Sequence, residues 1–312
     1  MSRHKFDENK LSVYVGPTNS VFSERLIKVT ANSGVSLKGF TLPKRKSSDV
    51  LGWAWKLKRS KSKIVHYLWG SYHPLIYIIP KLLGRKVIIH WIGSDVMDAT
   101  SNKEGSFYTL LQKIAYRMVD MHLADFEPLV DELKLLGVHA TVVPLAPDIP
   151  LLQEGVTWPS EDKVFVYLPE TRQEFYGSDI VFHLAQELPD VGFLITRHSG
   201  EGAPQLPNIK YLGWVDDMET VWREIKVYLR LTKHDGLSHT VIEALARGKH
   251  VIWTYEYAFC HRARTFQEAK DALRNILRQN QPNIEGMSYA RSQFEPAKIV
   301  ENFEQKYLEV LS

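Results

Sequence analysis

The chain has little that would place it in an oxidising compartment or inside a membrane. It contains one cysteine among 312 residues, Cys260, so no disulfide can form within the chain, and disulfides are typical of oxidising compartments. The polar start MSRHKFDENK does not resemble a secretory signal. Pro80 and Lys81 interrupt the run from Leu75 to Leu83, which is well short of the roughly 20 apolar residues of a membrane span. We therefore expect a cytoplasmic protein.

The sequence also lacks several motifs that would indicate metal or nucleic-acid binding. It has no zinc-ligand spacing, no RNA-recognition signature and no D-x-D triplet that would suggest a divalent metal site. It has no repeat and no low-complexity segment. We therefore expect no metal, no cofactor and no nucleic-acid partner. Hydrophobic residues make up 44% and charged residues 24% of the chain, which is normal for a soluble globular protein.

The net charge of +3 is divided unevenly along the chain. Residues 1–149 contain 21 Lys and Arg and 13 Asp and Glu, a net charge of +8, whereas residues 150–312 contain 18 and 23, a net charge of −5. A basic half can face the phosphates of an acceptor, an anionic membrane or a nucleic acid. Because nucleic-acid motifs are missing, the first two partners are favoured.

Strands alternate with helices along the chain. Apolar runs that suit strands lie at residues 10–16, 64–69, 86–91, 121–124, 141–144, 163–168 and 191–196. Helical patterns lie at residues 21–31, 73–83, 128–136 and 180–188. This alternation predicts an α/β protein with doubly wound parallel sheets. At this length we expect two domains, 1–149 and 150–295, with a breaker-rich linker at 148–160 and a terminal helix at 296–312 that crosses back to the first domain.

The stretch KVYLRLTKHDGLSHTVIEALARGKHVIWT, residues 226–254, organises the second half. Alternation over 227–231 predicts a strand, and the apolar face of 241–246 predicts a helix that starts after Ser238 and ends at Gly248. A second strand follows the helix. The loop between the first strand and the helix lies at the carboxyl end of a strand, where open α/β sheets bind ligands.

Two carboxylates flank the start of this helix. Asp235 lies in the loop, and Glu243 lies about one and a half turns into the helix. The backbone N–H groups of Gly236, Leu237 and Ser238, between the two carboxylates, can bind an anion. A phosphate seat between two hydroxyl-binding carboxylates fits a nucleotide sugar. The alternative is an ordinary strand–helix unit with an Asp near a helix cap and one solvated Glu.

The segment DGLSHTVIEALARGKHVI resembles the E-x(7)-E region of retaining glycosyltransferases with the GT-B fold, especially glycosyltransferase family 4. The matching positions are Gly236, Glu243, Ala244, Ala246, Gly248, Val251 and Ile252. The chain departs from the pattern at Asp235, where the family usually has Glu, at Ser238, where it often has Gly, and at His250, where it often has Pro. The resemblance implies that Asp235 binds hydroxyls of the donor sugar and that Glu243 binds the ribose.

The family also has an Arg and a Lys that clamp the diphosphate near the first strand of the second domain. The resemblance implies that Arg172 supplies the Arg. Tyr176 precedes Gly177 where the Lys is expected, so Lys233 is the candidate for the second cation. Because Arg binds phosphate bidentately, loss of Arg172 should weaken donor binding most.

Two more segments resemble site loops of the family. HWIGSDV spans the end of the strand predicted at 86–91 and a loop that we expect over residues 92–96. It resembles H-G-S-D-V, with Ile92 where many relatives have His. The resemblance implies catalytic roles for His90 and Asp95, and the alternative for His90 is a structural histidine. NIKYLGWVDD resembles the segment whose loop contacts the base, which implies a base-binding role for Gly213 and Trp214. The alternative for Trp214 is a core position.

The segment from Asp49 to Lys63, DVLGWAWKLKRSKSK, interleaves tryptophans with cations. Such a segment can bind the surface of an anionic membrane, which would place the protein on its inner face. The alternative is a helix that packs on the sheet through Trp53 and Trp55 and leaves its basic end in solvent.

These features predict a GT-B enzyme with two Rossmann-like domains and an interdomain cleft. It would transfer a hexose-like sugar from a UDP- or GDP-type nucleotide sugar to a hydroxyl of a saccharide or lipid-linked acceptor, in polysaccharide or glycolipid synthesis. The family implies retention of configuration and front-face attack assisted by the leaving phosphate. Because the sequence has no D-x-D triplet, nothing in it requires a divalent metal. Two alternatives stay open: a catalytically silent GT-B domain with a binding or regulatory role, and a nucleotide-sugar epimerase.

Overall fold

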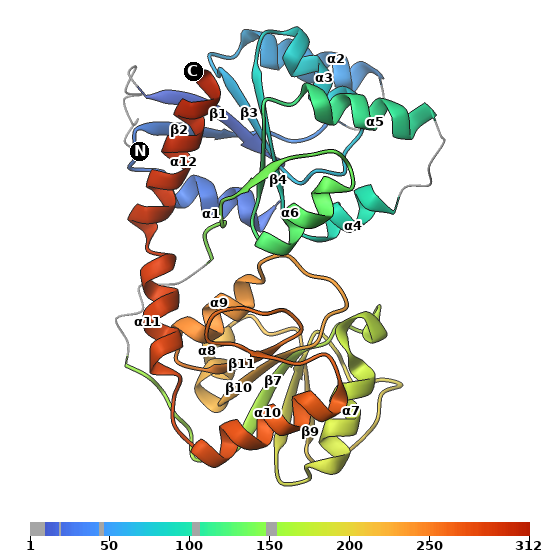
Figure 1. Ribbon diagram of the computed structural model, residues 1–312, viewed down its shortest axis with the longest axis vertical. Helices are drawn as coiled ribbons and strands as arrows, with labels where there is room; N and C mark the ends of the chain where they lie inside the picture. The colour runs from blue at the N-terminus through green and yellow to red at the C-terminus, as the bar shows by residue number, and fades with distance from the viewer. Residues whose placement is uncertain (1–9, 19, 44–46, 102–106, 148–154) are drawn as a thin grey trace. The chain divides into compact units, whose positions relative to one another are not determined.

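The computed structural model describes residues 10–18, 20–43, 47–101, 107–147 and 155–312. These residues form two compact units, shown in Figure 1. Unit 1 contains Met1–Ala146 and Glu295–Ser312, and unit 2 contains Pro147–Phe294. Each unit has a six-stranded, fully parallel sheet in its described part, with helices packed on it. The α/β fold class predicted from the alternation of strands and helices is therefore confirmed.

Unit 1 has the strand order β2-β1-β3-β4-β5-β6. Its strands are β1 (Leu11–Gly16), β2 (Val35–Gly39), β3 (Ile64–Leu68), β4 (Lys86–Trp91), β5 (Met121–Ala124) and β6 (Ala140–Val142). Its helices are α1 (Val21–Val29), α2 (Ser47–Arg59), α3 (Leu75–Leu82), α4 (Ser94–Thr100), α5 (Phe107–Met118), α6 (Glu127–Lys134) and α12 (Pro296–Leu311). All residues of β3 are buried, as expected for a parallel strand covered on both faces.

Helix α12 belongs to unit 1, although it lies at the end of the chain. It buries one stripe at helical spacing, formed by Ile299, Phe303, Tyr307 and Val310. Its Glu304 carboxylate accepts a hydrogen bond from the backbone N–H of Gly34 at 2.7 Å. The hydroxyl of Tyr307 lies 2.9 Å from Nδ1 of His66 in β3. The helix therefore completes the core of unit 1.

Unit 2 has the strand order β12-β11-β10-β7-β8-β9. Its strands are β7 (Lys163–Tyr167), β8 (Gly192–Thr196), β9 (Ile209–Gly213), β10 (Val227–Arg230), β11 (His250–Trp253) and β12 (His261–Arg262). Its helices are η1 (Gln173–Tyr176), α7 (Ser178–Glu187), α8 (Met218–Glu224), α9 (His239–Ala246), α10 (Phe266–Gln279) and α11 (Ile284–Gln293). The order reverses between β7 and β10, which marks a topological switch point.

Side-chain alternation along β7 explains why both faces of this sheet are covered. Val164 and Val166 point to one face and join a buried cluster with residues of α7 and α10. Phe165 points to the opposite face, where its ring stacks on Tyr228 at 4.8 Å and meets Trp222 of α8 edge-on at 5.3 Å. Each face therefore has its own apolar layer, as in doubly wound sheets.

The elements predicted for residues 226–254 are present as β10, α9 and β11. The expected loop over residues 92–96 is wrong in its second half, because α4 already begins at Ser94. Part of the predicted linker, residues 148–154, lies outside the described residues. In the described part of the chain, no helix combines the length and the apolar character needed to cross a bilayer.

Candidate active site

The carboxyl ends of β10, β11 and β12 border a cavity of about 460 Å³ in unit 2. One of these strands, β10, also forms the switch point of the sheet with β7, and open α/β folds bind their ligands near such a point. The lining residues come from η1, the start of α7, and the segments that follow β10, β11 and β12. A cavity of this size is within the range of roughly 300–1,000 Å³ that is typical of small-molecule sites.

Gly177 allows the start of α7 to lie against the end of β10. Its φ angle is +74°, and a Cβ at this position would lie 2.7 Å from both the Cβ and the carbonyl oxygen of Leu231. Only glycine accepts this conformation and this close approach. No described side chain caps the N-terminus of α7. The helix start therefore presents its positive end to the cavity, which favours an anion.

The cavity is lined by two cations, Lys233 and Arg264, and by two carboxylates, Glu174 and Asp179. The backbone N–H of Lys233 donates to the carbonyl oxygen of Phe175 at 2.8 Å, which fixes the loop after β10. The Nε atom of Arg264 donates to the carbonyl oxygen of Thr254 at 3.2 Å. This arrangement can hold a diphosphate between the helix start and the cations, with the carboxylates available to accept hydrogen bonds from hydroxyl groups.

The carboxylate of Asp235 is held by its neighbours. Nη2 of Arg230 donates to Oδ1 of Asp235 at 2.9 Å, and Nε donates to Oδ2, so the pair is bidentate. The indole N–H of Trp253 and the hydroxyl of Thr232 also donate to Oδ2, at 3.2 and 3.3 Å. The side chains of Arg230 and Asp235 are only 14% and 12% exposed. This geometry favours a role in holding the loop over the predicted contact with the donor sugar.

Ser238 occupies the N-cap position of α9, as predicted, but its hydroxyl makes no capping hydrogen bond among the described residues. Gly236 and Leu237, just before it, are buried. Glu243 lies in the second turn of α9 and is partly exposed. Its carbonyl oxygen accepts a hydrogen bond from Nη1 of Arg247 at 2.9 Å. Its role in binding a ribose stays a prediction.

Among the predicted donor-site residues, Lys233 lines the cavity. The others do not line it: Arg172, Gly213, Trp214, Asp235, Gly236, Leu237, Ser238 and Glu243. Arg172 has a left-handed backbone, and its guanidinium lies 4.2 Å from the centre of the Phe175 ring. Trp214 is 64% exposed, so the core alternative for this residue is wrong. It follows Gly213, whose φ is +61°, and the guanidinium of Arg197 lies over its ring at 3.7 Å. An exposed indole stacked on a cation offers a flat surface on which a base can stack.

Asp95 is fully buried in the first turn of α4. Its Oδ2 accepts a hydrogen bond from the backbone N–H of Gly70 at 2.7 Å, and its Oδ1 accepts from those of Ile92 and Gly93 at 3.0 and 2.9 Å. Burial raises the pKa of Asp95 to about 6, although the backbone donors oppose the shift. The carboxylate joins the loops after β3 and β4. This geometry favours a positioning role over the predicted contact with substrate.

His90 is also fully buried. Its ring stacks on that of His66 with centroids 5.6 Å apart, and Phe303 of α12 lies 5.9 Å from both rings. Burial lowers the pKa of His90 to about 3, so its ring is neutral near pH 7. His90 therefore packs in the core beneath α12. The environment fits a structural histidine and gives no support to the predicted catalytic role.

Known proteins match this chain in structure but not in sequence. The sequence matches no protein-family model and no curated protein. HepE from Anabaena, solved with bound UDP, is 13% identical over 96% of this chain and 100% of that chain, with a TM-score of 0.73. Sucrose-phosphate synthase from Thermosynechococcus elongatus is 11% identical over 97% of this chain and 99% of that chain, also with a TM-score of 0.73. This chain has the GT-B fold.

The lipopolysaccharide outer core galactosyltransferase WaaB is similar to the same extent, with 11% identity over 96% of this chain and 99% of that chain and a TM-score of 0.69. Each match covers both parallel sheets. The GT-B fold predicted from the E-x(7)-E resemblance is therefore confirmed. At this level of identity the similarity establishes the fold alone.

Three charged cavity residues of this GT-B chain were not predicted from the sequence: Glu174, Asp179 and Arg264. A signal for Arg264 was present, because Thr265 and Glu268 form a capping box that marks the start of α10. A cation directly before such a helix start, and after a short strand, lies at the carboxyl edge of the sheet. The Arg230–Asp235 pair had no comparable signal, because it depends on the path of the loop after β10.

Proposed function

We propose that this protein is a retaining glycosyltransferase that transfers a hexose-like sugar from a nucleotide diphosphate sugar to an acceptor hydroxyl. The observation that carries the proposal is the cavity at the carboxyl end of β10, one of the two switch-point strands of unit 2, with the uncapped start of α7, Lys233 and Arg264 around it. HepE, which has the same fold, has been solved with UDP and with UDP-glucose. That similarity supports a UDP-type donor, with GDP as the alternative.

The diphosphate binds at the start of α7, where Lys233 and Arg264 neutralise it. Glu243 accepts hydrogen bonds from the ribose, and the base stacks on Trp214. Fixed donors at the leaving diphosphate supply the largest catalytic term, because they stabilise the charge that develops as the glycosidic bond breaks. No nucleophile is assigned, so the leaving phosphate assists attack from the same face and the configuration is retained. The similarity to WaaB supports the proposal that the sugar is transferred to a growing polysaccharide or glycolipid.

A thermal-shift screen of nucleotides tests the donor site. A ligand that binds only the folded state at a hundredfold excess over Kd stabilises it by about 2.7 kcal/mol, which raises Tm by several degrees. We expect one base among UDP, GDP, ADP, TDP and CMP, with and without attached sugars, to give the largest shift. The shift should persist in EDTA. Absence of a shift with every nucleotide would exclude the donor site.

Glu243→Ala separates the ribose role from general effects on the fold. Loss of a charged hydrogen bond should weaken nucleotide binding by about 1.5–3 kcal/mol. Glu285→Ala, an exposed acidic residue of α11, is the matched control and should leave the affinity unchanged. Calorimetric titration gives both values, and equal affinities in the two variants would remove Glu243 from the site.

A catalytically silent GT-B domain is the second candidate function. The Arg230–Asp235 pair favours it, because the carboxylate that the family pattern assigns to the donor sugar is already engaged. Nucleotide binding without transfer to any saccharide or lipid-linked acceptor would support this candidate. Interconversion of free UDP-sugars without an acceptor would instead identify an epimerase.

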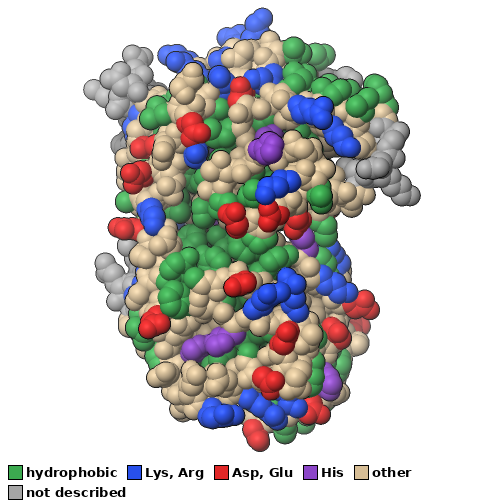
Figure 2. All heavy atoms as spheres, in the orientation of Figure 1, with side chains coloured by type: hydrophobic (Ala, Val, Ile, Leu, Met, Phe, Trp, Pro, Cys, Tyr) green, Lys and Arg blue, Asp and Glu red, His purple; other side chains and the backbone are tan. Residues whose placement is uncertain are grey.

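We also propose that unit 1 contacts an anionic membrane through α2, α3 and α5. Trp53 of α2 is buried on the sheet, but Leu51 and Trp55 on its outer side are 71% and 58% exposed. Leu82 of α3 and Phe107 and Leu110 of α5 are also exposed. Figure 2 shows hydrophobic and basic side chains next to one another over this end of unit 1. Apolar side chains beside Lys and Arg are typical of surfaces that bind anionic lipid.

A further inference from the structure

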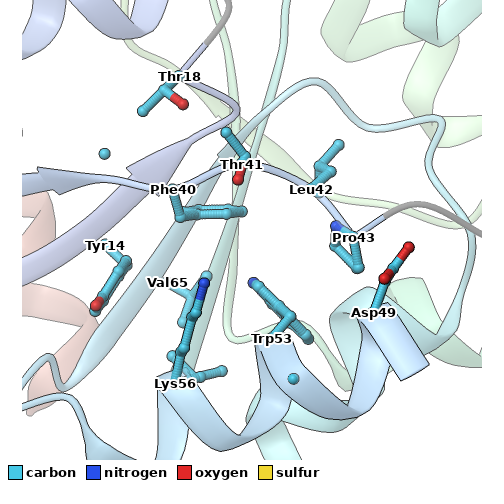
Figure 3. Close-up of a pocket in the computed structure, with 13 residues that line it drawn as sticks. Tyr14, Thr18, Phe40, Thr41, Leu42, Pro43, Asp49, Trp53, Lys56 and Val65 are labelled. Atoms are coloured by element: carbon cyan, nitrogen blue, oxygen red, sulfur yellow. The ribbon is translucent and has the colours of Figure 1, made fainter. Parts of the chain in front are cut away.

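A second cavity, of about 780 Å³, lies in unit 1 between the inner face of α2 and the sheet. Figure 3 shows Trp53 and Lys56 extending from α2 toward Phe40, at the end of β2, with Asp49 near the other end of the helix. Tyr14 of β1 and Thr18, just after that strand, complete the opposite wall. None of these residues lines the cavity in unit 2.

The inner face of α2 has an unusual composition for a crossover helix. The residues of this helix that line the cavity are 49, 52, 53, 56 and 57, which share one face at helical spacing. Such a face normally carries apolar side chains that pack on the sheet. Here only Trp53 and Leu57 are apolar and buried. Asp49 is partly buried and Lys56 is exposed, so this face carries opposite charges at the open rim of the cavity.

Gly52 is exposed and lines the open side of the cavity. A Cβ at Gly52 would have no heavy atom of the described residues within 4 Å, apart from its own helix and chain neighbours. A glycine inside a helix costs about 1 kcal/mol relative to alanine. Close packing against a neighbour cannot explain the glycine, because there is no neighbour to contact. Its absence of a side chain instead leaves this wall of the cavity open.

The chemistry of the walls narrows the class of ligand. The Phe40 ring lies 6.4 Å from Trp53 and 6.2 Å from Tyr14, so aromatic surface forms one side. Aromatic surface can pack against the apolar faces of a sugar ring, a carboxylate accepts hydrogen bonds from hydroxyl groups, and an ammonium pairs with an anionic substituent. Asp49 and Lys56 lie about 10 Å apart along the helix axis, so a ligand that reaches both is elongated.

We propose that this cavity binds an acidic saccharide, with Trp53 and Phe40 against a sugar ring, Asp49 on its hydroxyls and Lys56 on a carboxylate or phosphate substituent. A purely apolar ligand does not fit, because the wall carries a charge at each end of α2. The excess of cations in the first half of the chain favours an anionic ligand over a neutral one. This inference rests on the proposed glycosyltransferase function in one respect: the saccharide would be the acceptor.

The test uses the full chain and saturation-transfer NMR with two matched probes, a trimer of galacturonate and the uncharged galactose trimer of the same linkage. We expect binding of the acidic trimer at least tenfold tighter than that of the neutral trimer. Lys56→Gln should remove this preference, whereas Lys58→Gln, on the same helix but outside the cavity, should keep it. Gly52→Phe should fill the cavity and abolish binding, whereas Gly52→Ala should fold at least as stably as the wild type.

Three results would overturn the proposal: no binding of either trimer at millimolar concentration, equal binding of both, or undiminished binding in Gly52→Phe. If Gly52→Phe does not fold, Lys56→Gln decides the outcome. Displacement of the acidic trimer by equimolar inorganic phosphate would show that the cavity selects an anion and not a saccharide. Nucleotide thermal shifts on the same samples report on the donor site in unit 2. A failure of the donor-site proposal can therefore be told apart from a failure of the saccharide-cavity proposal.

Discussion

Nδ1 of His66 lies 2.9 Å from the hydroxyl of Tyr307, although 241 positions separate these residues in the chain. Both side chains are fully buried, and the contact joins β3 to α12. Tyr307→Phe removes this hydrogen bond and leaves a buried ring nitrogen without it, so we expect unit 1 to lose about 1–3 kcal/mol of stability. Urea unfolding and amide exchange in β3 measure the loss. Tyr108→Phe, at an exposed position of α5, is the control and should have little effect.

Acid should destabilise unit 1 through His90. Burial lowers the pKa of His90 to about 3, against about 6.5 in an unfolded chain. Below pH 6.5 the unfolded chain therefore binds a proton that the folded chain does not. The stability contributed by the neutral ring is complete above this pH and falls by about 1.4 kcal/mol per pH unit below it.

His90→Leu removes this titration. Between pH 6.5 and 5, we expect the wild type to lose about 2 kcal/mol of unfolding free energy that the variant keeps. Comparing the two proteins at each pH cancels the contribution of Asp95, whose raised pKa acts with the opposite sign. A difference that does not vary with pH would mean that His90 titrates normally.

The Arg230–Asp235 pair makes the effect of Asp235→Ala diagnostic. If the carboxylate holds the loop, its removal leaves the buried Arg230 uncompensated and should destabilise unit 2 by about 3–5 kcal/mol. The double variant Arg230→Met/Asp235→Leu removes both charges and should recover most of this loss. Urea unfolding provides the comparison. A stable Asp235→Ala protein that binds nucleotide but fails to transfer sugar would instead support contact with the donor.

Membrane contact predicts a salt-dependent association with vesicles. Vesicles that contain anionic lipid should sediment the protein at low ionic strength and release it as salt screens the charges. Replacement of Lys58, Arg59, Lys61 and Lys63 by Gln should abolish sedimentation, since each cation near the surface contributes about 1 kcal/mol. Lys210→Gln, an exposed position of unit 2, should not matter. Failure of the wild type to sediment with these vesicles would exclude the proposed membrane contact.

The sequence was most informative where local pattern alone determines structure. Alternation over 227–231 and the apolar face before Gly248 correctly predicted β10 and α9, because strand and helix periods differ. Gly248, with a φ of +71°, ends the helix as its position suggested. The E-x(7)-E resemblance was sufficient to predict the GT-B fold, since the motif lies in one strand–loop–helix unit at the sheet edge.

The sequence was less informative where partners are distant or loops decide the geometry. Nothing near Asp95 indicates that Gly70 donates to its carboxylate, because the two loops meet only when β3 and β4 pair. The partners of His90 lie in another strand and in the last helix. The empty space beside Gly52 depends on how far α2 lies from the sheet, which no local pattern determines. These features need the assembled sheet before they can be derived.

Because unit 1 consists of two chain segments, its last segment is synthesised after unit 2 is complete. A ribosome completes the continuous unit 2, Pro147–Phe294, before it makes the helix that covers His66 and His90. A chain interrupted before Glu295 would therefore present a finished second unit beside a first unit whose apolar surface is uncovered. Chaperones and proteases recognise such exposed surface. Synthesis of α12 thus distinguishes molecules with a covered unit 1 from interrupted ones.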